Sequence, residues 1–185
     1  MTDNSDYSFI KLVIQGTNNI IEIGDKSIID RLTIEIKGDN NHIIIHERVK
    51  CKNGKFHIDG DSNQLIIGKD TTFEQIKICQ IEDKNTITIG DDCMFSHGIV
   101  IRNGDSHSVL DLATSQRLNY SGNVTIKDHS WIGMNAIILK NVTINENSIV
   151  AANSLITKDI EANTIVGGNS AKLIKQNISW SRERI

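Results

Sequence analysis

A 22-residue repeat runs without a gap from Gly16 to Asn103 and limits this chain to a stacked, quasi-one-dimensional fold. Each unit opens on a polar corner, and the five corners read GTNN at 16–19, GDNN at 38–41, GDSN at 60–63, EDKN at 82–85 and GDSH at 104–107. Because fixed self-similarity means that each unit packs on the next, the chain is predicted to form a solenoid. His107 takes the position that asparagine holds in the four earlier corners, so we expect chemistry at this point of the scaffold.

Aliphatic side chains recur at fixed positions and predict which columns point inward. Two such columns are Ile21, Ile43, Leu65, Ile87 and Val109, and Ile23, Ile45, Ile67 and Ile89. From Ile126 the period shortens to six, with Ile126, Ile132, Ile138, Ile144, Val150 and Ile156, and of the residues four positions later only Ile160 is bulky. This pattern suits a triangular coil of three short strands, with turns stacked at about 4.8 Å. The longer early units predict a bulge or a longer corner in each.

Two segments fit neither period. The stretch LATSQRLNYSG at 112–122 is predicted to be a loop projecting just after His107, and loops on rigid scaffolds often carry binding residues. In the stretch 171–180, Ile174 and Ile178 lie four apart and predict a short amphipathic C-terminal helix. We therefore expect a single β-helix domain over 1–185, with 22-residue repeats at 16–103, a catalytic segment and loop at 104–125, hexapeptide coils at 126–166 and a C-terminal tail with the helix at 167–185.

Composition narrows the function classes. The chain has 185 residues, a formal net charge of −3 and a pI near 6.1, which argues against a nucleic-acid partner. Apolar runs fall short of the roughly 18 residues of a membrane span, and the polar start MTDNSDYS lacks the regions of a signal peptide, so a cytoplasmic protein is expected. The sequence has three cysteines, Cys51, Cys79 and Cys93, and the first and last of them fall in inward columns. The odd number and these positions predict reduced thiols in the core and no disulfides.

The motifs after residue 102 resemble a known superfamily. NGDSHS at 103–108, followed by the loop and by DHSWIG at 128–133, is similar to the sugar and polysaccharide O-acetyltransferases of the hexapeptide-repeat superfamily. The resemblance runs from Ile89 to Trp180 and is closest to bacterial polysialic acid and capsular polysaccharide O-acetyltransferases. It implies an all-β, left-handed parallel β-helix and an acetyl-CoA-dependent enzyme that acetylates a sugar hydroxyl of a bacterial surface polysaccharide or its precursor. It also implies a homotrimer with active sites between subunits.

The resemblance assigns roles to His107, Trp131 and Asp105. In the superfamily the histidine is the catalytic base and the tryptophan lies by the sulfur of the donor. Imidazole suits proton transfer near neutral pH, and such a base contributes about 10²–10⁴-fold. The plain alternatives are that His107 is another corner residue and that Trp131 packs against a neighbouring subunit. Asp105 is a candidate to hold the imidazole tautomer, although its equivalents Asp39, Asp61 and Asp83 favour a role in the turn.

Elements similar to the coenzyme A groove of the superfamily follow at 150–160 and 167–172. The resemblance implies close backbone approach at Gly133, with an N–H nearby for the oxyanion. It places the pantetheine arm beside Ala151 and Ala152, and it assigns further contacts to Thr157, Lys158, Lys172 and Lys175, the last two for the nucleotide phosphates unless they are ordinary surface lysines. Asn153 and Ser170 stand where the family has glycine and proline, which leaves the contacts at the adenine end open.

Several readings stay open at this point. Arg117 in the loop is a candidate for an acceptor carboxylate. An N-acetyltransferase of a nucleotide-linked amino sugar is the nearest alternative, although the sequence lacks the glycine-rich fingerprint of an α/β nucleotide-binding domain. A second alternative is a non-catalytic, structural β-helix, which would bind no coenzyme A. A zinc enzyme of the γ-carbonic anhydrase type would need His97, His107 and His129 to converge, but they occupy dissimilar columns, so no metal is expected.

Overall fold

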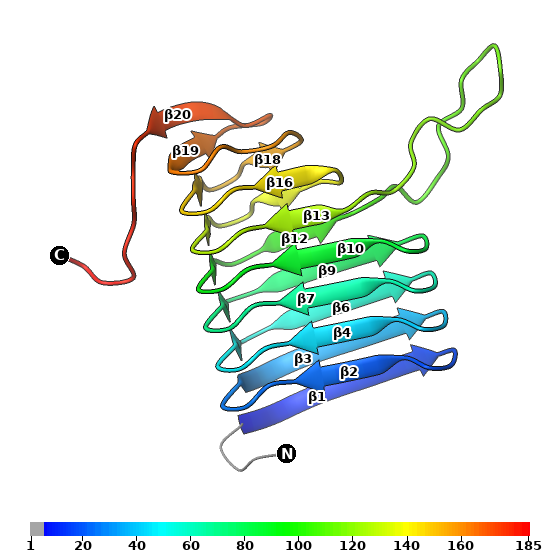
Figure 1. Cartoon of the computed structure of the whole chain (residues 1–185), viewed down its shortest axis with the longest axis horizontal. Coiled ribbons are helices and arrows are strands. Elements are labelled where there is room, and N and C mark those ends of the chain that lie inside the picture. The colour runs from blue at the N-terminus through cyan, green and yellow to red at the C-terminus, as the bar shows by residue number, and fades with distance from the viewer. Residues whose placement is uncertain (1–5) are drawn as a thin grey trace.

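A computed structural model describes residues 6–185, whose strands wind into a parallel β-helix with a projecting loop (Figure 1). Most of the polar start, on which the prediction about a signal peptide rests, lies outside these residues. The described part of the chain contains no helix that is long and apolar enough to cross a membrane.

The strands stack into three faces. Face I holds β5 (Lys50–Cys51), β8 (Thr72–Phe73), β11 (Met94–Phe95), β14 (Trp131–Ile132), β17 (Ile149–Val150) and β19 (Thr164–Gly167). Face II holds β6 (Gly54–Asp59), β9 (Ile76–Ile81), β12 (Ile99–Arg102), β15 (Ile137–Ile138) and β18 (Leu155–Ile156). Face III holds β2 (Ile20–Ile23), β4 (His42–Ile45), β7 (Gln64–Ile67), β10 (Thr86–Ile89), β13 (Val124–Ile126) and β16 (Val142–Ile144).

The remaining strands close the two ends. β1 (Asp6–Gln15) pairs in parallel with β3 (Ile28–Lys37), which turns from face I into face II and pairs with both β5 and β6. β20 (Lys172–Gln176) adds to β19 in the antiparallel sense. This arrangement confirms the predicted all-β, left-handed parallel β-helix with an extruded loop after His107.

The core follows the predicted periodicity. Ile126, Ile132, Ile138, Ile144, Val150 and Ile156 are all fully buried, as are the inward aliphatic residues of the middle coils. Burying each such side chain stabilises the fold by about 1.5–3 kcal/mol. The prediction for Val109 is wrong: it is 56% exposed, because the chain leaves the coil after Asn103. Ile21 and Ile23 are only partly buried, since they belong to the end coil.

The three cysteines are free and buried, as predicted. Burial raises the pKa of Cys51 and of Cys93 to about 12. Both thiols therefore stay protonated at neutral pH and behave as small apolar core residues.

The four extra residues of the early units lie mainly in the strands of face II. β6 and β9 have six residues each, whereas β15 and β18 have two. The registers of β6 with β3 and β9 are continuous, so the expected bulge is absent from these strands. Side chains alternate along β6, so that Phe56 and Ile58 point inward while Lys55, His57 and Asp59 point outward. Face II is thus wide in the early coils and narrow in the later ones, with the step at β12.

Buried asparagines close the corner between faces II and III. Asn41 Oδ1 accepts the N–H of Asn63, and Asn63 Oδ1 accepts that of Asn85, each at 3.0 Å. Asn41 Nδ2 also donates to the Gly60 carbonyl at 2.9 Å. At the next rung Glu82 replaces glycine and has φ of 66° instead of the 145° of Gly60. Within the described residues Asn63 Nδ2 consequently has no hydrogen-bond partner.

Asparagine also turns the later corners. Asn135, Asn141, Asn147, Asn153 and Asn163 all have φ between 54° and 59°, the left-handed region that asparagine tolerates better than most residues. Asn153, which stands where the superfamily has glycine, therefore meets the same backbone requirement.

The predicted C-terminal helix is wrong. Lys172–Gln176 form β20, and the apolar Leu173 and Ile174 in it are exposed. The last strand of the stack, β19, offers an unpaired edge of N–H and C=O groups, and pairing with this edge outweighs the weak helical pattern of the tail. Beyond β20 the tail runs back along the edge of the β-helix opposite the loop (Figure 1).

We predict that Asn41→Ala lowers the free energy of unfolding more than Asn63→Ala. The first change leaves the Asn63 N–H and the Gly60 carbonyl without their partner, and each such group costs roughly 1–3 kcal/mol when buried. The second removes only the bond accepted from Asn85, because Asn63 Nδ2 is already unpaired within the described residues. Denaturant unfolding of both variants beside the wild type measures this difference. Equal losses would contradict it.

Candidate functional site

His107 lies at the base of the loop, where face II narrows. Asn103 clamps this base: its Oδ1 accepts the Ile81 N–H at 2.7 Å, its Nδ2 donates to the Ile81 carbonyl at 3.2 Å, and its own carbonyl accepts the Gly122 N–H at 2.8 Å. At Gly104 a Cβ would lie 2.8 Å from the Ile81 side chain. Glycine at position 104 therefore lets the start of the loop lie against β9. Because the chain leaves the coil here, His107 does not continue the column of buried asparagines.

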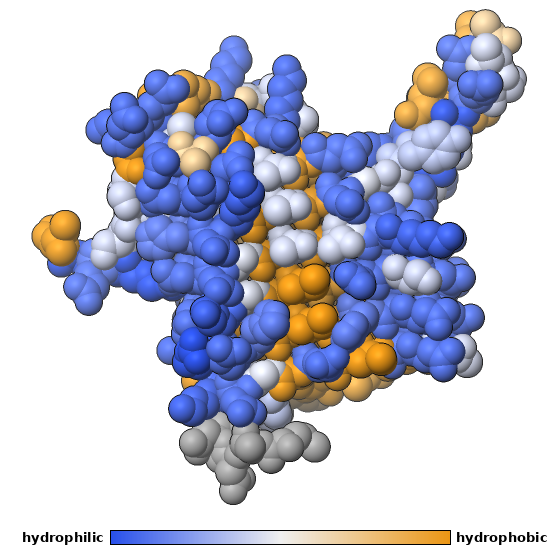
Figure 2. Space-filling view, in the orientation of Figure 1, coloured by the Kyte–Doolittle hydropathy of each residue, from blue (hydrophilic) through white to orange (hydrophobic). Residues whose placement is uncertain are grey.

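The loop itself is an exposed hairpin (Figure 1). Leu110 and Arg117 form an antiparallel bridge, and Asp111 Oδ1 accepts the N–H groups of Ala113 and Thr114 at the turn. These bonds, led by the one from the Thr114 N–H, hold the pKa of Asp111 below its ordinary value. The loop exposes a set of apolar side chains, namely Val109, Leu110, Leu112, Leu118 and Tyr120. Figure 2 shows hydrophobic residues at its tip.

Glu82 anchors the loop to the early coils. Its carboxylate pairs with the Arg117 guanidinium and accepts the Ser121 N–H at 3.2 Å. Partial burial opposes ionisation, but the bonds from Arg117 and Ser121 outweigh it and keep the pKa of Glu82 below its ordinary value. Arg117 is therefore paired with a carboxylate of this chain, and it also lines the groove that contains His107, so its role toward an acceptor carboxylate stays a prediction.

Asp105 acts on the main chain of His107. Asp105 Oδ2 accepts hydrogen bonds from Lys140 Nζ at 2.7 Å and from Asn119 Nδ2 at 2.8 Å, and Asn119 Nδ2 also donates to the His107 carbonyl at 2.8 Å. The bond from Lys140 and then that from Asn119 lower the pKa of Asp105. Its hydrogen bonds to described residues do not include the imidazole, so the predicted tautomer-holding contact is not formed in this chain. Asn119 and Lys140 carry no sequence pattern that would have marked them.

The earlier corner aspartates serve the turn, as the alternative reading held. Asp39, Asp61 and Asp83 each accept a backbone N–H from the preceding repeat, at 2.6 to 2.8 Å. Asp105 has left this pattern together with His107.

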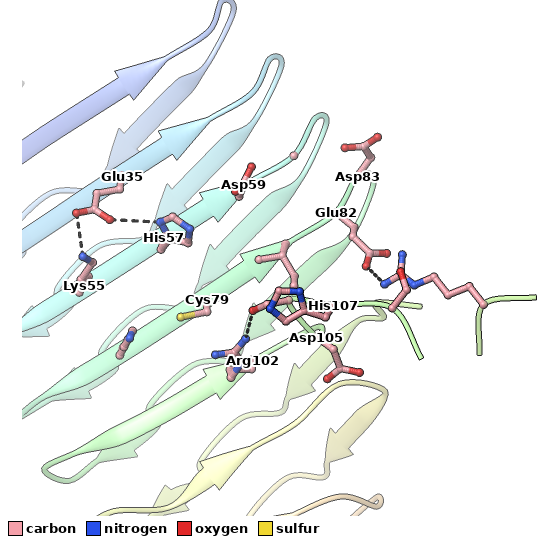
Figure 3. A pocket seen from close by; sticks show the side chains of 16 residues that line it. Glu35, Lys55, His57, Asp59, Cys79, Glu82, Asp83, Arg102, Asp105 and His107 are labelled. Atoms are coloured by element: carbon pink, nitrogen blue, oxygen red, sulfur yellow. Dashed lines mark hydrogen bonds and ion pairs between the residues drawn. The ribbon is translucent and has the colours of Figure 1, made fainter. Parts of the chain in front are cut away.

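His107 lines an open groove of about 700 Å³ on face II. Figure 3 shows His107 and Arg102 at one end of the groove, with Glu35, Lys55 and His57 toward the other. His107 is exposed, so its imidazole is accessible to a bound molecule.

Trp131 lies on a different face. It is 37% exposed on β14 of face I, and it lines a second groove of about 430 Å³ with Met94, Phe95 and Arg182. Among residues 6–185, His107 and Trp131 thus line two different grooves. The fold presents them on separate faces of the prism.

The C-terminal tail holds the surroundings of Trp131. Trp180 stacks on His129 with centroids 4.2 Å apart, its Nε1 donates to the His129 carbonyl at 2.7 Å, and its ring lies 5.9 Å from that of Trp131. His129 Nδ1 contacts Asp92 Oδ2 at 2.7 Å, and Arg182 Nε donates to Asp92 Oδ1 at 2.8 Å. Sequence reasoning missed Trp180, and these contacts show that His129 packs between Asp92 and the tail.

The residues predicted to bind coenzyme A spread over the C-terminal coils. At Gly133 a Cβ would lie 2.7 Å from the Val150 carbonyl, to which the Gly133 N–H already donates at 2.8 Å, so coil stacking explains this glycine. Ala151 is half-buried under β19, and Ala152 is exposed at the same corner. Thr157 and Lys158 line a cavity of about 210 Å³ under the tail. Lys172 and Lys175 are exposed on β20.

Three histidines were weighed as zinc ligands. Among residues 6–185, no three or more His, Cys, Asp or Glu side chains are grouped as a metal site.

These features define a left-handed β-helix protein that carries a histidine-bearing loop at the step between wide and narrow coils. Residues 123–158 match the family described as bacterial transferase hexapeptide (six repeats). A polysialic acid O-acetyltransferase of Escherichia coli O1:K1 is 42% identical over 84 residues, which are 45% of this chain and 27% of that protein. A polysialic acid O-acetyltransferase of Neisseria meningitidis is 51% identical over 89 residues, 48% of this chain and 41% of that protein. Each match thus spans less than half of the relative's length.

Two solved structures are similar over almost the whole chain. The polySia-specific acetyltransferase NeuO has a TM-score of 0.77 at 27% identity, covering 94% of this chain and 89% of that one. The polysialic acid O-acetyltransferase OatWY has a TM-score of 0.76 at 28% identity, covering 96% and 93%. The resemblance predicted from the motifs is confirmed.

We predict that Glu82→Gln releases the loop. Trypsin should cleave after Arg117 several-fold faster, because the guanidinium loses its ionic partner, while the unfolding free energy of the β-helix changes by less than about 1 kcal/mol. Limited proteolysis followed by mass spectrometry measures the cleavage, and Glu74→Gln, which breaks an exposed pair with Lys52, is the matched control.

Acidification should have the same effect on the wild type. The pKa of Glu82 is lowered when the loop is anchored, so its carboxylate stabilises the anchored loop fully at pH values above its ordinary pKa. This stabilisation is lost as the pH falls through the lowered pKa. Protection of Arg117 should therefore decline only in that acidic range. Equal cleavage of wild type and Glu82→Gln at neutral pH would contradict the anchor.

Proposed function

We propose that this protein is an acetyl-CoA-dependent O-acetyltransferase acting on a sugar hydroxyl of a bacterial capsular polysaccharide, with sialic-acid-containing polymers as the leading acceptor class. The observation that carries the proposal is the placement of His107, an exposed imidazole on the wall of an open groove at the base of an anchored loop. The similarity to polysialic acid O-acetyltransferases supports the choice of reaction and acceptor.

In this mechanism His107 is the general base. It takes the proton of the acceptor hydroxyl as the oxygen attacks the carbonyl carbon of the thioester. The tetrahedral intermediate then collapses, the C–S bond breaks, and the thiolate leaves and regains a proton from the imidazolium. Asp105 acts through Asn119 to hold the main chain of His107 in place.

Trp131 and the C-terminal coils bind the donor in this proposal. The indole N–H of Trp131 faces the departing thiolate, and the pantetheine arm lies by Ala151, Ala152 and Thr157. Lys158, Lys172 and Lys175 bind the phosphates. The ion pairs found among residues 6–185 include none of these three lysines, which supports the assignment. We place the reaction in the cytoplasm, where acetyl-CoA is available.

The active site is completed in a homotrimer. Because His107 and Trp131 lie on different faces of one chain, a neighbouring copy is needed to bring the base of one to the donor site of the other. The exposed apolar side chains of the loop support this assembly, since an apolar arm of this kind gains stability when it packs on a second copy.

We predict that His107→Ala lowers kcat by about 10²–10⁴-fold and leaves binding of coenzyme A unchanged. Free thiol release from acetyl-CoA, measured over a panel of acidic and neutral bacterial glycans, gives the rates, and calorimetry gives the binding. His97→Ala removes another exposed histidine and should retain activity. Undiminished acceptor-dependent turnover in His107→Ala would refute the assignment of the base. A wild type that does not bind coenzyme A would refute the proposed function.

We further predict that Leu112→Glu dissociates the assembly. Light scattering on a sizing column should give the mass of three 20.6 kDa chains for the wild type and that of one chain for the variant, because a charge would enter the apolar contact of the loop. Phe9→Glu alters an exposed apolar side chain at the other end of the β-helix and should leave the mass unchanged. A trimer that survives Leu112→Glu would show that the loop does not carry the contact.

A further inference from the structure

The groove that contains His107 extends over the wide coils, away from the proposed reaction centre. Its wall comes from four successive rungs of face II, β3, β6, β9 and β12, and from the loop base. Three strand spacings of about 4.8 Å give it a length of roughly 14 Å along the helix axis. The groove is therefore longer than a single sugar ring, which is all that the transfer of one acetyl group requires.

Most charges along the groove are paired within the chain. Glu35 binds Lys55 Nζ at 2.8 Å and His57 Nδ1 at 3.3 Å. The other carboxylates are paired as well, Asp59 with Lys37, Glu82 with Arg117 and Asp105 with Lys140, while Asp83 accepts the N–H of Asp61. These anions therefore do not repel a bound anion with their full charge.

Two cations of the groove lack such a partner. Among residues 6–185, neither Lys77 nor Arg102 has a carboxylate oxygen within 4 Å, whereas Lys55 and Arg117, the other lysine and arginine that line the groove, both do. The charge of Arg102 contributes, after the bonds from Lys140 and Asn119, to lowering the pKa of Asp105. Its side chain donates one hydrogen bond to a described residue, to Ser106 Oγ at 3.2 Å. Most of the five guanidinium N–H donors thus remain available to a ligand.

The strand register brings these two cations together. Lys77 is level with Val100 on β12, and Cys79 is level with Arg102. Lys77 and Arg102 are therefore diagonal neighbours, two residues apart on adjacent strands, and both line the groove. Arg102 also lies next to His107 at the end of the groove in Figure 3. A ligand held by the pair would extend from the imidazole toward the early coils.

We propose that Lys77 and Arg102 form an acceptor subsite that binds a carboxylate of an anionic glycan, and that the polymer lies along face II of the 22-residue coils with its target hydroxyl at His107. The direction of the polymer rests on the proposed function. Arginine suits this role because its planar fork can bind a carboxylate through two parallel hydrogen bonds, while lysine adds a point charge. The early coils then serve as a binding surface as well as a scaffold.

The test measures binding and kinetics separately. Oligosialic acids of defined length are titrated into the protein without acetyl-CoA, with carboxyl-reduced oligomers as the uncharged counterpart. Arg102→Gln and Lys77→Gln should each weaken binding of the acidic oligomers roughly threefold to tenfold and raise their KM by the same factor. The KM for acetyl-CoA should stay as in the wild type. Lys69→Gln, which breaks an exposed ion pair with Asp91 outside the groove, is the matched control.

Chain length gives a second readout. Wild-type affinity should rise with oligomer length until the groove is filled and then level off, and it should fall with added salt. The double variant should lose most of both dependences. Carboxyl-reduced oligomers should bind wild type and variants alike.

Several outcomes would overturn the subsite. A rise in the KM for acetyl-CoA instead of the acceptor would assign the two cations to the phosphates of the donor. Unchanged binding and KM in both variants would remove them from recognition altogether. If the wild type binds acidic oligomers through these residues but transfers no acetyl group to them, the subsite stands and the proposed function fails.

Discussion

The structure depends on hydrogen bonds between equivalent residues of successive coils. Strand pairs, the asparagine column and the corner aspartates all join a residue to its counterpart one turn away, so each coil must repeat the geometry of the one below it. Under this constraint, each inward position must carry a side chain that fits the same place in the core of every coil. Variation is confined to outward side chains and to the corners, and the candidate site lies at the one corner where the chain leaves the stack.

Two departures from the repeat support that corner. Glu82 gives up the glycine conformation, which leaves Asn63 Nδ2 unpaired among the described residues, and its carboxylate gains Arg117. Asp105 leaves the backbone of the preceding repeat and binds Lys140 and Asn119. The coil thus gives up hydrogen bonds between successive repeats, and the same residues hold the loop and the main chain of His107 in place. Local deviations of this kind are expected where a scaffold carries function.

Periodicity was sufficient to predict the fold because every coil repeats the same inward pattern. It failed where a residue's partner is distant in sequence. Ile174 and Ile178 have helical spacing, but Ile174 lies in β20, which pairs with the free edge of β19, and the Ile178 N–H donates to the Asn163 carbonyl. The partner of Arg117, Glu82, lies 35 residues earlier, and no local pattern marked this pair. Trp180 reaches His129 across 51 residues through a tail that has no pattern, so no local signal could have marked it.

The contact between the tail and face I has an optical consequence. The chain has two tryptophans, Trp131 and Trp180, and their rings lie 5.9 Å apart. All indole fluorescence therefore comes from one spot on the molecule, which includes Trp131, the residue that we propose lies by the donor sulfur. Emission would therefore be sensitive to changes around face I and the tail. It would report directly on donor binding and on detachment of the tail, without any attached dye.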